Sequence, residues 1–475
     1  MSVAAALVAA ISLAGCGSTT YFAGRTLPPS GLQYRVLIAV QNPTALVKGA
    51  LVFVDAFYDV RFAYNGTKTG YSISGFSGQL PVTIQNMPEE ESGFVYGSGD
   101  GSFTPINYAK ESAGTAVSGL NGTASSIFIS RAQNYIIAAN ESAHVLTVVD
   151  RNSNGGSFPL NLPGVYKVSM NAGGSAALAF VRNSNYAYYP RKLTDAQSIA
   201  YSGGTSTWPK AAVDCEPQNI PKWCLFQAQS PDAVDGTGTP YGNPLTFDRP
   251  VKAVFTADGS TAYVLSCGPE CGGVTSKVTP LPVAPIIYLT GQASGTLPTT
   301  ANLASIPIPG GASNALLSQS TMYVVGQQLQ TDNLFTGNLT VVNLNSNTAS
   351  SPISISDGTP GGPSRLILGD DNTLWIGMTK CNNGERYAKG FDYGCLTMFN
   401  TSTNSVTMLE PYLGDLTGIA AVTGLHKVYV AQGGQIYIYS TVDGTAYNNQ
   451  YVTVAATASD VAYMDAKSDG NNTVY

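Results

Sequence analysis

The sequence predicts an all-β protein, on three observations. Gly accounts for 51 and Tyr for 27 of the 475 residues, and Gly together with frequent Asn, Ser and Thr is typical of tight turns between short strands. Short apolar segments alternate with such turns along the chain. Charged residues make up only 11% against 44% hydrophobic residues, which excludes a disordered or coiled-coil chain.

A unit of short strands recurs along the chain. It consists of an apolar strand, a polar turn, a Tyr-Val type strand, a Gly/Asn/Ser turn and a strand such as Leu-Thr-Val-Val-Asp, and its clearest copy covers 126–150. The second strands lie near residues 37, 95, 136, 178, 264, 323, 375 and 429. Six of the seven spacings lie between 41 and 59 residues, which suits a four-stranded unit with loop insertions.

Stacking of these units around an axis predicts a β-propeller over residues 32–475. One such sheet cannot bury both faces alone, and a ring of sheets leaves only short edges. Eight blades are predicted, with seven as the alternative. The remaining spacing of 86 residues is either one blade with an insertion around 190–249 or a degenerate extra unit. An array of β-sandwiches is the competing fold and needs about 100 residues per domain.

The two ends of the predicted ring complement each other. Segments 34–40 and 50–55 supply the second and third strands of a unit without a first one. The last apolar strand, 459–464, has no full unit after it. We therefore expect this strand to pair with 34–40 and close the ring.

The Tyr-Val type repeat resembles the Tyr-Val-Thr-Asn repeat of bacterial β-propellers, which are related to lactonase-like propellers. The resemblance covers about Tyr34 to Tyr475. It implies ligand binding at the mouth of the central channel, where the enzymes among these proteins use His, Glu, Asp or Arg, often with a metal.

The amino terminus predicts export and lipid anchoring. Residues 3–13 form an apolar run that ends in Leu13-Ala14-Gly15-Cys16 and is too short for a permanent membrane helix. These four residues resemble the lipobox of bacterial lipoproteins, which implies a signal peptide over 1–15, lipidation of Cys16 and a flexible tether over 16–31. Gly17 in place of Asp implies sorting to the outer membrane of a Gram-negative cell. An ordinary signal peptide with an incidental Cys is the alternative.

The six remaining cysteines fall into three local pairs. Pairing of neighbours is favoured because each pair lies within one Pro/Gly/Asn-rich loop or hairpin, and an even count in an exported chain indicates disulfides. A zinc site is weakly supported because no His lies near any pair and the chain has only two. The expected disulfides are Cys215–Cys224, Cys267–Cys271 and Cys381–Cys395.

Sequence motifs for catalysis are few, and no catalytic residue is assigned. His144 and His426 are expected in turns, and no Gly-x-Ser-x-Gly elbow or Walker-type loop is present. The formal charge is −6 and Lys and Arg do not cluster along the sequence, which argues against nucleic acid as a partner. The run Glu89–Glu91 is interpreted as a solvated turn.

A calcium loop is the best metal candidate, although we do not expect a cofactor. Asp150, Asn152 and Asn154 alternate as in the start of such a loop, with Gly155 after them. Asn161 stands where a bidentate Glu is expected, and similar turns recur at 343–347 and 400–404. The interpretation as a hairpin turn is therefore favoured.

Aromatic residues offer the remaining candidate site. Tyrosines of the repeating strands, such as Tyr135 and Tyr429, are expected to pack between blades. A less regular group could form an exposed binding surface, since aromatic side chains offer large contact areas; it comprises Tyr186, Tyr188, Tyr189, Tyr201, Trp208 and Trp223.

Together these features predict an exported, lipid-anchored binding or scaffold module at the cell envelope, with a protein or glycan as partner. A lactonase-like hydrolase or lyase and an envelope assembly factor are the alternatives. Acids, His or Arg gathered at one channel mouth favour an enzyme, whereas a bare channel with an aromatic outer face favours a binding module.

Overall fold

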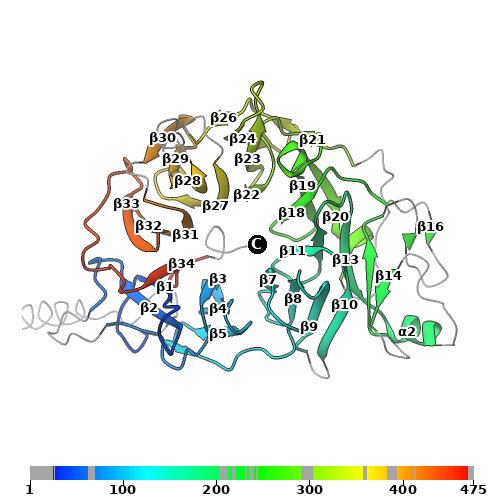
Figure 1. Ribbon diagram of the computed structural model, residues 1–475, viewed down its shortest axis with the longest axis horizontal. Coiled ribbons are helices and arrows are strands. Elements are labelled where there is room, and N and C mark those ends of the chain that lie inside the picture. The colour runs from blue at the N-terminus through cyan, green and yellow to red at the C-terminus, as the bar shows by residue number, and fades with distance from the viewer. Residues whose placement is uncertain are drawn as a thin grey trace, which may run out of the picture.

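Eight antiparallel sheets stand around one axis in the computed structural model of the protein (Figure 1). This arrangement confirms the all-β propeller and the count of eight blades. The structure describes residues 25, 27–62, 70–152, 155–202, 212–216, 221–229, 233–234, 240–241, 244–289, 303–356, 361–381, 393–409 and 413–468.

The first four blades are numbered in chain order, with their strands given from the axis outward. Blade 1 contains β34 (Thr457–Tyr463), β1 (Arg35–Gln41) and β2 (Gly49–Asp55); blade 2 contains β3 (Pro81–Met87), β4 (Ser92–Gly97), β5 (Phe103–Asn107) and β6 (Ser112–Ala113); blade 3 contains β7 (Ser126–Ile129), β8 (Tyr135–Asn140), β9 (Val145–Asp150) and β10 (Gly156–Asn161); blade 4 contains β11 (Val165–Met170), β12 (Ala177–Val181), β13 (Ala187–Lys192), β15 (Trp223–Gln227) and β14 (Ala212–Cys215).

The other four blades complete the ring. Blade 5 contains β18 (Pro250–Phe255), β19 (Thr261–Ser266), β20 (Lys277–Pro282) and β21 (Ile306–Pro307); blade 6 contains β22 (Asn314–Ser318), β23 (Thr321–Leu329) and β24 (Phe335–Asn343), with β25 (Thr348–Ala349) and β26 (Ile353–Ser354) both on β24; blade 7 contains β27 (Gly362–Gly369), β28 (Thr373–Cys381), β29 (Tyr393–Asn400) and β30 (Ser405–Leu409); blade 8 contains β31 (Leu416–Val422), β32 (Lys427–Gln432) and β33 (Gln435–Ser440).

Short elements lie outside the blades. Helix α2 (Asp195–Ser202) and the strand pair β16 (Ala233–Val234) and β17 (Pro240–Tyr241) follow blade 4 strand β13, and single turns of helix occur at Pro88–Glu90, Gly268–Cys271 and Val283–Ile287. The turn at Pro88–Glu90 joins β3 to β4, which agrees with the turn expected for the Glu89–Glu91 run.

Apolar side chains between neighbouring sheets form the core. Ile38 of blade 1 and Tyr429 of blade 8 belong to one buried cluster, and Leu146 of blade 3 packs in a cluster with Ala179 of blade 4. Each sheet is therefore covered on both faces by its neighbours, which is how a ring buries what a single sheet would expose.

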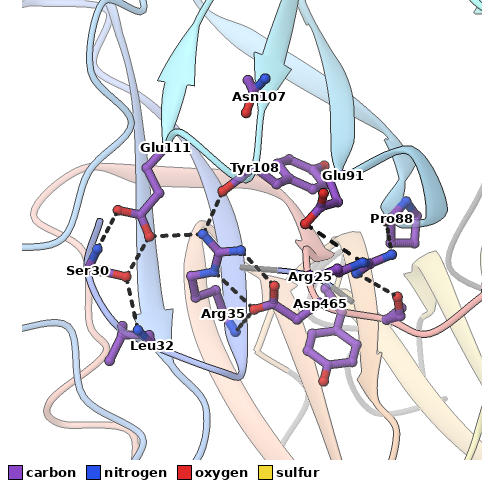
Figure 2. Close-up of polar contacts among 12 residues, drawn as sticks. Arg25, Ser30, Leu32, Arg35, Pro88, Glu91, Asn107, Tyr108, Glu111 and Asp465 are labelled. Carbon is purple, nitrogen blue, oxygen red and sulfur yellow. Dashed lines mark hydrogen bonds and ion pairs between the residues drawn. The ribbon is translucent and has the colours of Figure 1, made fainter. Parts of the chain in front are cut away.

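The ring closes by pairing of the chain ends, as expected. Strand β34 pairs antiparallel with β1, with Val36 opposite Tyr463. Just beyond β34, the Asp465 carboxylate accepts hydrogen bonds from Arg35 Nε at 3.0 Å and Nη2 at 2.7 Å (Figure 2). Glu111 of the neighbouring blade 2 accepts from Arg35 Nη1 at 2.9 Å. We call Arg35, Asp465 and Glu111 the closure cluster; it joins both chain ends to blade 2.

Blade 4 explains the long spacing of the repeat. It is one five-stranded blade, because β15 pairs with β13 in register Tyr188 to Gln227 and β14 pairs with β15. Blades 1 and 8 carry three named strands each, so not every blade has the four strands that the repeat predicts.

The three local cysteine pairs are bonded: Cys215–Cys224, Cys267–Cys271 and Cys381–Cys395. Disulfides persist in oxidising compartments, so they indicate an extracytoplasmic protein. Within the described ranges, no helix has the length and apolar character needed to cross a bilayer.

Candidate functional site

Two members of the aromatic group around the insertion are buried rather than exposed. Trp223 has no exposed area and Tyr189 only 3%. Trp223 lies between Tyr135 and Phe158, with ring centroids 5.9 and 6.1 Å away, because it starts the additional strand β15. The surface prediction is wrong for these two residues. Tyr186 and Tyr188 are half-buried.

Of the proposed calcium ligands, Asp150 ends strand β9 and Asn152 lies in the segment that follows it. Asp150 Oδ2 accepts a hydrogen bond from Lys192 Nζ at 2.7 Å, and Oδ1 accepts from Asn152 Nδ2 at 2.8 Å. Burial alone would raise the pKa of Asp150, but the hydrogen bonds from Lys192 and Asn152 outweigh it and lower that pKa. Among the described residues no group of three metal-ligating side chains occurs. The arrangement supports the hairpin interpretation.

Three predicted positions, Cys16, Asn154 and Trp208, lie outside the described residues, as do the side-chain surroundings of Tyr201. Both histidines occupy turns with positive φ, 60° at His144 and 53° at His426. The exposed His426 ring lies 2.8 Å from Asp371 Oδ2, and this hydrogen bond raises the pKa of His426.

The inner strands carry a repeated irregularity that sequence inspection did not find. Strands β3, β11, β18, β27, β31 and β34 each have a β-bulge near their first residue. Bulges re-aim side chains and are frequent beside functional sites. The residues that follow the bulge therefore occupy equivalent positions around the axis; they are Thr83, Lys167, Lys252, Arg365, Gly418 and Asp460.

A cavity of about 390 Å³ lies at this level of the central channel, within the usual size range of ligand pockets. Its lining includes Thr83, Lys252, Arg365 and Asp460, and it extends to Tyr96 between blades 2 and 3. The channel is therefore not bare, contrary to what we expected of a binding module.

Arg365 and Asp460 line one side of this cavity, where each is held by contacts with the protein. Arg365 Nη2 lies 3.4 Å from Asp460 Oδ2, and Arg365 Nε donates to the Thr417 carbonyl at 2.8 Å. Asp460 Oδ2 also accepts from the backbone N–H of Ile84 at 2.8 Å, and Oδ1 from that of Val461 at 3.0 Å. Burial raises the pKa of Asp460, against the effect of Arg365 and these amides. Both carboxylate oxygens are thus engaged.

On the other side of the cavity, Lys252 has a hydrogen-bond partner but no carboxylate partner among the described residues. Its Nζ donates to Asn314 Oδ1 at 2.6 Å, and Asn314 Nδ2 donates to the Ser364 carbonyl at 3.0 Å. In the described part of the chain no carboxylate forms an ion pair with Lys252. Burial, reinforced by the neighbouring cations Lys167 and Arg365, lowers the pKa of Lys252 to about 8.

Lys167 stands at the equivalent position of the adjacent inner strand, and it faces an acid held by a disulfide loop. The loop of Cys267–Cys271 carries Glu270, which accepts a hydrogen bond from the backbone N–H of Gln327 at 2.9 Å. Burial of the half-buried Glu270 raises its pKa, whereas Lys167 is exposed at the surface of its strand. The two groups interact only through space.

Hydrophobic side chains supply the rest of the lining. Ile127 and Phe128 of blade 3, Leu316 of blade 6 and Ile367 of blade 7 border the cavity. A pocket with a few polar groups on an otherwise apolar wall is typical of small-molecule sites.

Comparisons with known proteins identify the fold and no family. No family model matches the chain, and no curated protein matches it. The chain is similar to dihydro-heme d1 dehydrogenase NirN, solved in complex with DHE, with 10% identity, 94% of this chain and 78% of that chain covered, and a TM-score of 0.50. It is also similar to AztD from Citrobacter koseri (11% identity, 90% and 96% covered, TM-score 0.48) and to a putative 6-phosphogluconolactonase from Bacteroides fragilis (10% identity, 94% and 99% covered, TM-score 0.42).

The fold and the cavity define an eight-bladed β-propeller with charged side chains gathered in its central channel. Identities near 10% support likeness of fold alone, and function depends on the site.

Proposed function

We propose that the protein is an exported, lipid-anchored binding module of the bacterial cell envelope that takes its ligand into the central channel. The observation that carries this proposal is the cavity at the start of the inner strands, which is lined by the post-bulge residues of four blades. The proposed binding region is therefore this cavity, in place of the aromatic surface that the sequence predicted at the insertion.

Binding is favoured over catalysis by the state of the one acid that lines the described cavity wall. A general base must be free to accept a proton from its substrate. Asp460 accepts from two backbone amides and lies beside Arg365, so both of its carboxylate oxygens are already occupied by the protein.

Export and anchoring rest on the lipobox-like residues Leu13–Cys16 and on the disulfides. Lipidation at Cys16 would tie the propeller to the outer membrane, since several acyl chains give stable attachment where one does not. A protein or glycan of the envelope remains the expected source of the bound group.

The anchor is tested by Cys16→Ser, with Gly17→Ser as the matched control. We expect Cys16→Ser protein in the soluble fraction, with the unfolding midpoint of the propeller unchanged, and Gly17→Ser protein in the membrane fraction. Cys16→Ser protein that stays in the membrane pellet through washing would contradict the anchor.

A lactonase-like hydrolase or lyase is the second candidate, and the lowered pKa of Lys252 favours it. An amine with a pKa of about 8 is partly unprotonated near pH 8 and can then act as a base or nucleophile. Assay of lactone hydrolysis tests this candidate: turnover that is lost in Lys252→Met would replace the binding proposal with an enzymatic one.

A further inference from the structure

The charges around the channel cavity do not cancel. Two cations, Lys252 and Arg365, and one carboxylate, Asp460, line the cavity. Arg365 is paired with Asp460. One positive charge is therefore left over, and Lys252 is the cation without an acidic partner in the described structure.

The position of Lys252 makes this surplus available to a ligand. It lines the cavity together with Asn314, and its contact with Asn314 satisfies one of the three ammonium donors. Lys252 is half-buried, and a partly desolvated cation without a counter-ion is unfavourable, so an anion that enters the cavity gains from pairing with it.

The lining indicates what the rest of the ligand is like. Ile127, Phe128 and Leu316 border the same cavity, so a ligand that fills it places a carbon skeleton against apolar walls. A surplus of one charge suits a group with one negative charge, which a carboxylate carries at pH 7 and a phosphate monoester exceeds.

We propose that the central channel binds a small organic monocarboxylate, with the carboxylate on the Lys252 ammonium beside Asn314, and the carbon skeleton against Ile127, Phe128 and Leu316. This inference rests on the proposed function as a channel-binding module and specifies its ligand class. It is independent of the lipid anchor.

Calorimetric titration of the full chain at pH 7 with three ligands that carry the same phenyl ring tests the proposal. Benzoate supplies the carboxylate, benzamide is its uncharged counterpart, and phenyl phosphate carries the higher charge. We expect benzoate to bind one to one, at least tenfold more tightly than benzamide or phenyl phosphate.

Variants then assign the contact to the channel. Lys252→Met is expected to weaken benzoate binding at least tenfold, Lys252→Arg to restore part of it, and Lys110→Met, which removes an exposed lysine of a blade 2 turn, to leave it unchanged. Circular dichroism confirms that each variant is folded.

Several outcomes would overturn the proposal. Absence of benzoate binding, equal binding of benzamide, or unchanged affinity in folded Lys252→Met each removes the carboxylate site. Tighter binding of phenyl phosphate reassigns the site to phosphate esters. The titration is done in solution, so failure of Cys16 anchoring does not affect it, and a released Cys16→Ser protein that binds no benzoate leaves the anchor intact.

Discussion

One cluster of charged side chains lies just beyond the end of strand β34, and another lies nearer its start. The two clusters differ in whether positive and negative charges cancel. At the far end of the strand, Arg35 is 3% exposed and places three guanidinium nitrogens on Asp465 and Glu111. Near the start of the strand, Asp460 lines the channel cavity, where cationic side chains outnumber acidic ones.

The difference in charge pairing distinguishes a cluster that stabilises the fold from a cluster that can bind a ligand. In the closure cluster every charge has a partner inside the protein, and Arg35 Nη1 also donates to the Tyr108 carbonyl at 2.7 Å. In the channel, Lys252 has only an amide oxygen. A buried charge that the fold satisfies holds the ring together, whereas one that the fold leaves unpaired is open to a ligand.

The largest effect is expected on breaking the closure cluster. Arg35→Met leaves Asp465 and Glu111 buried without their cation, and removal of one partner from a buried ion pair destabilises a protein by about 3–5 kcal/mol. Denaturant unfolding of the variant measures this loss of unfolding free energy.

Arg182→Met is the matched control, because Arg182 pairs with Glu141 at the surface, where its side chain is 57% exposed. We expect a change within about 1 kcal/mol. Equal effects of the two variants would show that the closure cluster contributes no more than a surface pair.

A smaller effect is expected when the acid of the channel is neutralised. Asp460→Asn keeps an oxygen for the Ile84 amide and frees Arg365, so the surplus positive charge increases. Benzoate affinity should rise about fivefold, equivalent to about 1 kcal/mol at a partly hydrated site. Titration of the variant measures this, and unchanged or weaker binding would show that channel charge does not act on the ligand.

The fold was largely predictable from the sequence because the strand pattern of each blade repeats along the chain. The unit of about 50 residues with its Tyr-Val strand identified the blades, and the unmatched strands at the two ends identified the closure between β1 and β34. The local cysteine pairs followed from the even cysteine count in an exported chain and from the location of each pair within one loop or hairpin. Blade 4 was only half predictable, since two interpretations of its long spacing differ in how the insertion pairs.

The channel site was not predicted from the sequence because its residues lie far apart along the chain. Lys252, Arg365 and Asp460 come from three blades, and each is a single charge in a short apolar strand. Their common signal is their place in the first strand of the unit, beside a bulge that only strand pairing reveals. The aromatic prediction failed for a similar reason: Trp223 is buried because β15 joins the sheet, a pairing that composition does not show.

A further prediction concerns how the stability of the protein changes with pH. The pKa of Lys252 is about 8 in the folded protein and about 10.5 in the unfolded chain, so below pH 8 both states hold this proton and the folded state carries the full penalty of an unpaired cation. Between these two values the unfolded chain binds more protons, and stability rises with pH through this group.

Lys252→Met removes that penalty. Each unit of pKa difference corresponds to about 1.4 kcal/mol, and water in the channel screens part of it, so we expect the variant to be more stable by about 1–2 kcal/mol at pH 7. Its advantage over the native chain should shrink from pH 8 upward and disappear near pH 10.5. Unfolding free energies of both proteins across this range, with Lys110→Met as a flat control, measure the trend. A Lys252→Met variant that is less stable at pH 7 would mean that the fold already satisfies this lysine, and the contrast with Arg35 would be lost.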